Sequence, residues 1–143
     1  MKIRLLVLVT KGLSDDYVDQ LMGDVKRTLA EAGIANVALQ DSGSWFREQF
    51  QRLGDWDSWI WETVNGVDYI TRQHNFDGFV VTSDQLGKAN AGIVQLALRN
   101  KRAVLHYVED RPLRKVLEVH ADDPENWAEG WSIDSTALEA GHG

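Results

Sequence analysis

The chain has 143 residues, of which 43% are hydrophobic and 26% are charged, a composition typical of one globular domain with a sizeable core. Its formal net charge of −7 at pH 7 argues against sequence-independent binding to nucleic acid, which requires clustered lysine and arginine. The chain has no cysteine, which excludes disulfides, thiolate metal sites and cysteine nucleophiles. No apolar run reaches the length of a membrane span or a signal peptide, so we expect a cytoplasmic protein that binds neither DNA nor a membrane.

The N-terminal part of the chain alternates strand and helix. Residues 3–9, IRLLVLV, form a continuous apolar run that predicts a strand covered on both faces. Residues 14–32 predict an amphipathic helix, with Ser14 as its N-cap and Gly33 as its C-terminal stop. Residues 34–40 predict the second strand.

The segment that follows has the most unusual composition in the chain. Its apolar side chains recur at helical spacing and are interrupted at Gly54 and Asp55, which predicts one kinked helix or two shorter ones. It holds four of the six tryptophans, Trp45, Trp56, Trp59 and Trp61. Because Trp59 and Trp61 cannot share one helix face, two interpretations stay open. Either two tryptophans are core and two are partly exposed, or they form an aromatic platform for a partner subunit, a base or a sugar.

Residues 76–110 organise the fold. They predict a strand over 77–82, a polar loop, a helix that begins near Gly87 or Lys88, and a strand over 103–108. Alternation of strands and helices from residue 3 onward predicts an α/β fold, a doubly wound three-layer sandwich with a four- or five-stranded, mostly parallel sheet of the Rossmann or flavodoxin-like type.

The remaining expectations concern the C-terminal part of the chain. A short helix is expected over 111–117, with Pro112 in its first turn, and a fifth strand over 117–120. We expect residues 1–134 to form a single α/β domain and residues 135–143, which are small and polar, to form a flexible tail.

Candidate site residues follow from topology, because ligands of such sheets bind beyond the carboxyl ends of the strands. The predicted ligand-binding residues are Lys11, Gly12, Asp41, Ser42, Ser83, Gly87, Lys88, Asn90 and Asp110. The most specific stretch runs from Ser83 to Lys88 and opens a helix, where free N–H groups and the helix dipole favour an anion. A plain capped helix start explains the same residues, and the stretch matches neither a Walker motif nor G-x-G-x-x-G.

The layout of residues 77–111 resembles the nucleoside 2-deoxyribosyltransferase group. The resemblance is carried by the strand DGFVV, a loop with Asp84, a helix ending in RNKRAV and a strand followed by Glu-Asp-Arg. It implies a nucleoside or nucleotide ligand, N-glycosidase or deoxyribosyltransferase-type chemistry, and catalytic positions at Asp84 and Gln95. The nucleophile of that family is a glutamate, and its position is best matched here by Gln95 and less well by Asn90. Neither amide can form the glycosyl ester that a carboxylate forms. We therefore expect a binding protein with at most residual activity.

A second resemblance, to CRISPR-associated Rossmann-fold sensor domains, is carried by Thr82, the loop with Gly87 and Lys88, and the strand ending His106-Tyr107-Val108. It implies an adenine-type ligand and a homodimer. No metal and no cofactor are expected, because the histidines and carboxylates lack metal-ligand spacing. A non-enzymatic interaction module working through residues 45–61 is the alternative function, and a flavin-binding flavodoxin-like protein is a third.

Overall fold

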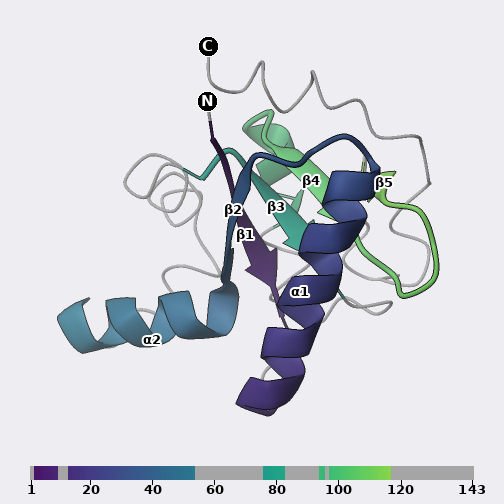
Figure 1. Cartoon of the computed structure of the whole chain (residues 1–143). Coiled ribbons are helices and arrows are strands. Elements are labelled where there is room, and N and C mark those ends of the chain that lie inside the picture. Colours follow the sequence, from purple (N-terminus) through teal and green to yellow (C-terminus); the bar gives the residue numbers. More distant parts are fainter. Residues whose placement is uncertain (1, 10–12, 54–75, 83–93, 96, 117–143) are drawn as a thin grey trace.

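The computed structural model describes residues 2–9, 13–53, 76–82, 94–95 and 97–116 (Figure 1). Its elements are β1 (Ile3–Leu8), α1 (Asp15–Glu31), β2 (Val37–Asp41), α2 (Ser42–Leu53), β3 (Gly78–Val81), β4 (Ala103–His106) and β5 (Arg114–Lys115). Expectations for residues 54–75, 83–93 and 117–143 lie outside this description. They include three of the tryptophans discussed above, the start of the third helix, and the fifth strand over 117–120.

The described strands form one five-stranded mixed sheet in the order β2-β1-β3-β4-β5. β1 pairs in parallel with β2 and β3, β3 pairs in parallel with β4, and β4 pairs antiparallel with the short β5. Figure 1 shows α1 lying across one face of this sheet, whereas α2 leads away from the end of β2. The predicted α/β class is therefore confirmed for the described residues.

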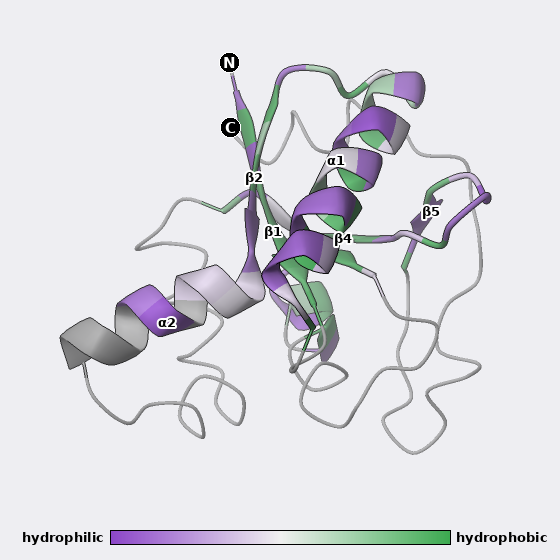
Figure 2. Ribbon diagram, turned by 60° about the horizontal axis from the view of Figure 1, so that its bottom comes forward, coloured by the Kyte–Doolittle hydropathy of each residue, from purple (hydrophilic) through white to green (hydrophobic). Residues whose placement is uncertain are grey.

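Helix α1 begins and ends as its sequence predicts. The Ser14 hydroxyl oxygen accepts a hydrogen bond from the Tyr17 N–H at 3.2 Å, the bond expected of an N-cap serine. At the other end Gly33 has φ of 90°, and the Ile34 N–H donates to the Leu29 carbonyl at 2.8 Å. This is a helix-closing motif that requires a left-handed residue, which glycine adopts without strain. Figure 2 shows the hydrophobic stripe of α1 turned toward the sheet.

The helical segment before β4 closes in a similar way. Lys101 takes the left-handed position with φ of 59°, and its N–H donates to the Leu98 carbonyl at 3.0 Å. The Arg102 N–H reaches the Ala97 carbonyl at 2.9 Å. The helix of the predicted βαβ unit therefore ends near residue 100, directly before the parallel strand β4.

The core lies on both faces of the sheet, as the continuous apolar run of β1 predicts. The cluster on the α1 side consists of Ile3, Leu5, Val7, Val25, Leu29, Ile34, Val37, Val80, Leu105, Tyr107 and Leu113. On the opposite face, Leu6, Leu8, Phe79 and Val81 are at most 1% exposed. Side chains alternate along a strand, so β1 and β3 bury both of their faces.

The amino ends of β1 and β3 are joined tightly. The Arg4 N–H donates to Asp77 Oδ2 at 2.8 Å, and the Asp77 N–H donates to the Arg4 carbonyl at 2.7 Å. Gly78 follows, and a β-carbon at this position would lie 2.8 Å from the Ala103 carbonyl oxygen of β4. Only glycine fits this close approach of β3 and β4 without displacement.

Two predictions about the elements are corrected. The second strand runs over Val37–Asp41 rather than 34–40, because Ile34 completes the closing motif of α1 and Asp41 still pairs with Val7. The helix expected over 111–117 is wrong, since Arg114 and Lys115 form β5 along the free edge of β4. An isolated helix of that length is marginal in water, and pairing with an existing strand supplies the backbone hydrogen bonds instead.

Candidate functional site

The carboxyl ends of four parallel strands share one edge of the sheet, at Leu8, Asp41, Val81 and His106. Four of the predicted site residues are described by the structure, namely Asp41, Ser42, Gln95 and Asp110. The others, Lys11, Gly12, Ser83, Asp84, Gly87, Lys88 and Asn90, lie outside the described residues.

Asp41 closes β2 and opens α2. Its Oδ2 accepts a hydrogen bond from the Ser44 N–H at 2.8 Å, so Asp41 is the N-cap of α2. Gly43 lies inside this turn, where a β-carbon would come 3.3 Å from the same carboxylate oxygen. Asp41 is partly exposed, and the bond to Ser44 occupies only one of its two oxygens.

Ser42, by contrast, is enclosed. Its side chain is 2% exposed, and its Oγ accepts a hydrogen bond from the Val9 N–H at 2.9 Å. The Thr82 hydroxyl donates to the Leu8 carbonyl at 2.9 Å, just beyond β3. These two bonds tie the end of β1 to β3 and to the β2–α2 corner, by which we mean residues Asp41 to Ser44.

Gln95 and Asp110 do not lie at this corner. Gln95 is partly buried on the helical segment that precedes β4. Asp110 is exposed in the loop between β4 and β5, where the Arg111 N–H donates to the Val108 carbonyl at 3.1 Å. Its φ of 62° is a left-handed conformation, which aspartate and asparagine tolerate better than most other residues.

A groove of about 670 Å³ lies between the second half of α1 and the loop of residues 107–113 that holds Asp110. We call it the α1 groove. Its lining residues are Asp24, Arg27, Thr28, Glu31, Ala32, Tyr107, Glu109, Asp110, Arg111, Pro112 and Leu113. The rule that ligands bind beyond strand ends also points to Glu109, Asp110 and Arg111, whereas the lining residues on α1 were not predicted as part of a site. The only available signal was the spacing of Asp24, Thr28 and Glu31 along one helix face.

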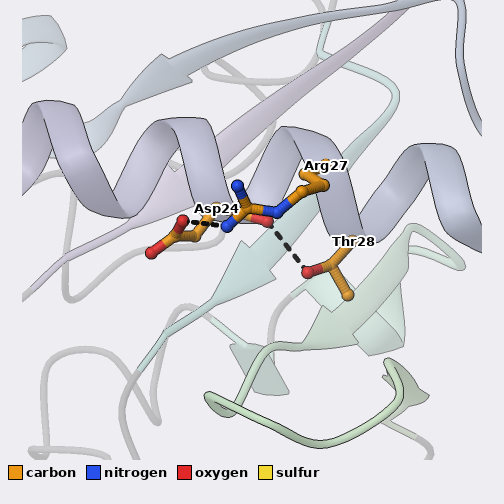
Figure 3. A network of polar contacts seen from close by, with 3 residues as sticks. All are labelled: Asp24, Arg27 and Thr28. Carbon is orange, nitrogen blue, oxygen red and sulfur yellow. Dashed lines mark hydrogen bonds and ion pairs between the residues drawn. The ribbon is translucent and has the colours of Figure 1, made fainter.

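One wall of the α1 groove is a polar network on α1 itself (Figure 3). The Arg27 guanidinium forms an ion pair with the Asp24 carboxylate, and the Thr28 hydroxyl donates to the Asp24 carbonyl at 2.9 Å. Both contacts lie within the helix, so they fix α1 side chains and do not tie α1 to the loop of residues 107–113.

Tyr107 is one of the residues that line the α1 groove, and it is 7% exposed. Burial raises the pKa of its phenol, and the negative charges of Asp24, Glu109 and Asp110 add to this while Arg27 opposes it. Its hydroxyl forms no hydrogen bond with any residue that the structure describes. The phenol is therefore a neutral group held against a charged surface.

Of the four tryptophans between residues 45 and 61, Trp45 is the one that the structure describes. It is 1% exposed and packs edge-to-face on Phe76, with ring centroids 6.1 Å apart and planes at 75°. The Arg4 guanidinium lies 5.3 Å from the centre of the same Phe76 ring. Trp45 is thus a core residue and not part of an exposed platform.

Among the described residues, no three histidine or carboxylate side chains come together closely enough to hold a metal ion. Within the same part of the chain, no helix combines the length and the apolar character needed to cross a membrane.

Comparison with protein-family models, with curated proteins and with solved structures found no match to this chain. Its class is therefore defined by the fold alone, as an α/β protein whose described strands form one mixed five-stranded sheet. Within the described residues, polar side chains gather at the β2–α2 corner and in the α1 groove.

Proposed function

We propose that this chain is a nucleoside- or nucleotide-binding protein built on a doubly wound sheet, with its ligand at the carboxyl ends of β1, β2 and β3. The observation that carries the proposal is the strand order. From β1 the chain moves outward to β2 and then returns past β1 to β3 and β4, so the order reverses between β1 and β3. In open α/β sheets, the crevice at such a reversal is the usual ligand site.

Asp41 supports the choice of a nucleoside. It ends the strand next to β1, which is the position from which an acidic residue of nucleotide-binding α/β folds accepts a ribose hydroxyl. Its Oδ2 is engaged by the Ser44 N–H, which fixes the orientation of the carboxylate. Oδ1 has no hydrogen bond among the described residues, and it is the oxygen that would receive the ribose hydroxyl.

The roles proposed for the other site residues come from the sequence pattern. In this proposal Ser83, Gly87 and Lys88 bind the anionic part of a nucleotide at a helix N-terminus, and Lys11 and Gly12 border the same crevice. Ser42 acts indirectly, by holding the end of β1 in place. Binding is the proposed activity, because Gln95 offers an amide where glycosyl transfer needs a carboxylate nucleophile.

Calorimetric titration of the purified chain with adenosine, AMP and cyclic dinucleotides tests this proposal. Asp41→Asn is the informative variant, because asparagine caps a helix as well as aspartate does and only the negative acceptor is lost. We expect about tenfold weaker binding of ribonucleosides to Asp41→Asn, the effect of losing one charge-assisted hydrogen bond.

Two controls sharpen the result. Glu48→Gln removes a charge from an exposed part of α2 and should leave the affinity unchanged. A 2′,3′-dideoxynucleoside should bind wild type and Asp41→Asn equally, since it lacks the hydroxyls that Asp41 would accept. The proposal fails if no nucleoside or nucleotide binds, or if Asp41→Asn binds ribonucleosides as tightly as wild type.

A further inference from the structure

His106 is a buried polar residue at the carboxyl edge of the sheet. Among the described residues, the buried polar side chains belong to Ser42 and His106. The bond to the Val9 N–H accounts for Ser42, whereas the site described so far gives His106 no role. It is 7% exposed and is the last residue of β4, so it lies at the edge where the proposed ligand binds. Burying a group that can gain a charge near neutral pH is costly unless a counter-charge is available.

The register of the sheet places Arg114 beside His106. His106 lies between Val81 of β3 and Arg114 of β5, its partners on the two neighbouring strands. Partner residues share one face of a sheet, and the β-carbons of an antiparallel pair are about 5 Å apart. Val81 belongs to the face opposite α1, so the side chains of His106 and Arg114 project from that face. Two residues after Val81 the chain enters the stretch Ser83 to Lys88, which is proposed to bind an anion.

Arg114 is available to an anion. Its side chain is partly buried and forms no hydrogen bond or ion pair with any residue that the structure describes. The carboxylates of the loop before β5, Glu109 and Asp110, line the α1 groove instead. Like charges directly opposite each other destabilise a sheet, so an arginine opposite a protonated histidine becomes favourable when an anion joins the two. Phosphate is suited to this position, because guanidinium and imidazolium groups both donate charge-assisted hydrogen bonds to its oxygens.

We propose that His106 and Arg114 bind the 5′-phosphate of a nucleotide whose ribose is held by Asp41. The inference rests on the proposed function and names the phosphorylated form, rather than the free nucleoside, as the ligand. Asp41 and His106 end β2 and β4, which are three strand spacings apart in the sheet, roughly 14 Å at about 4.8 Å per spacing. A nucleotide that lies along this edge has its sugar near one end and its phosphate near the other, and the side chains reach toward it from both ends.

Calorimetric titration of the full chain with AMP and with adenosine tests the inference. We expect wild type to bind AMP at least about tenfold more tightly than adenosine, since only AMP offers the charged acceptor. Arg114→Gln should weaken AMP binding about tenfold and leave adenosine binding unchanged, because it removes a charged donor to the phosphate. His106→Gln should lower the preference for AMP in the same way. A purely structural loss would weaken both ligands, so the ratio of the two affinities reports recognition of the phosphate.

Lys115→Gln is the matched control. It removes an equal charge from the next residue of β5, whose partner Leu105 places it on the α1 face, and it should leave both affinities unchanged. Asp41→Asn should weaken AMP and adenosine alike, since both carry the ribose hydroxyls. The inference is overturned, while the nucleoside site is retained, if adenosine binds and AMP binds no more tightly, or if Arg114→Gln weakens AMP binding no more than Lys115→Gln does. If neither ligand binds wild type, the inference and the proposed function fail together.

Discussion

The β2–α2 corner and the α1 groove both gather polar side chains, but within the described residues only the corner uses them to accept backbone N–H groups. In the groove the Thr28 hydroxyl bonds a carbonyl of its own helix. At the corner, Ser42 Oγ and Asp41 Oδ2 accept backbone N–H groups at 2.9 Å and 2.8 Å. In the α1 groove, the Tyr107 hydroxyl has no partner among the described residues, and the Asp110 side chain is exposed. Groups bonded to the backbone stabilise the fold, whereas groups without a partner contribute little to it and remain open to a ligand.

This contrast changes what each site offers for function. At the corner, one oxygen of Asp41 is left to bond a ligand, and the orientation of that oxygen is already fixed. In the groove more polar groups are left for a ligand, and the loop of residues 107–113 contributes Tyr107 and Leu113 to the core cluster. The two regions should therefore respond in opposite ways when a single polar atom is removed.

The largest effect is expected for Ser42→Ala. The Val9 N–H would lose its acceptor beside a side chain that is 2% exposed, which should lower the free energy of unfolding by about 1–3 kcal/mol. Urea unfolding monitored by circular dichroism measures this loss. Ser44→Ala is the matched control, because its hydroxyl accepts only from the exposed Arg47 side chain and should cost less than about 0.5 kcal/mol. Equal losses in the two variants would show that the corner is not held by Ser42.

A smaller loss is expected for Asp41→Ala. Removing the N-cap of α2 should lower the free energy of unfolding by about 1 kcal/mol, measured in the same urea experiment. Asp41→Asn should stay close to wild type, since the amide oxygen can accept the same Ser44 N–H. If asparagine and alanine cost the same, the carboxylate acts through its charge and not through the cap.

In the α1 groove, removing a polar atom should leave the free energy of unfolding almost unchanged. Tyr107→Phe keeps the ring that packs in the core cluster and removes only a hydroxyl without a partner among the described residues. Its free energy of unfolding should differ from that of wild type by less than about 0.5 kcal/mol. A loss above about 1 kcal/mol in urea unfolding would mean that the hydroxyl has a structural partner, and the contrast with Ser42 would disappear.

The parts of this fold that could be predicted are those with a local cause. The apolar run of β1, the Ser14 cap and the Gly33 stop each depend on a few neighbouring residues, and each prediction agrees with the structure. The helix expected over 111–117 failed because β5 depends on the free edge of β4, which no local pattern reveals.

The candidate site residues also divide into those that a local pattern predicts and those that only the tertiary structure brings together. Asp41 and Ser42 were predicted from the rule that ligands lie beyond strand ends, and the structure does place them at the carboxyl edge. Asp110 was selected by the same rule, yet it lies in the α1 groove, because the chain turns at Val108 to Arg111 and passes beside α1. Asp24 and Tyr107 are far apart in the sequence, and only the tertiary structure brings them together.

The smallest expected effect is on pH dependence, and it tests the groove environment without a ligand. Burial, with help from Asp24 and Glu109, raises the pKa of the folded Tyr107 phenol above its ordinary value of 10.0. The folded state therefore holds this proton more tightly than the unfolded state. The resulting stability is fully present below pH 10.0 and is lost as pH rises through the folded pKa.

Urea unfolding of wild type and Tyr107→Phe at about pH 9 and about pH 11 checks this expectation. Wild type should lose more stability than Tyr107→Phe between the two values, because phenylalanine has no proton to release. All other titrating groups are common to both proteins, so their contributions cancel in the difference. Equal losses in the two proteins would mean that the phenol titrates alike in the folded and unfolded states. The α1 groove would then not be a negatively charged environment that favours the protonated phenol.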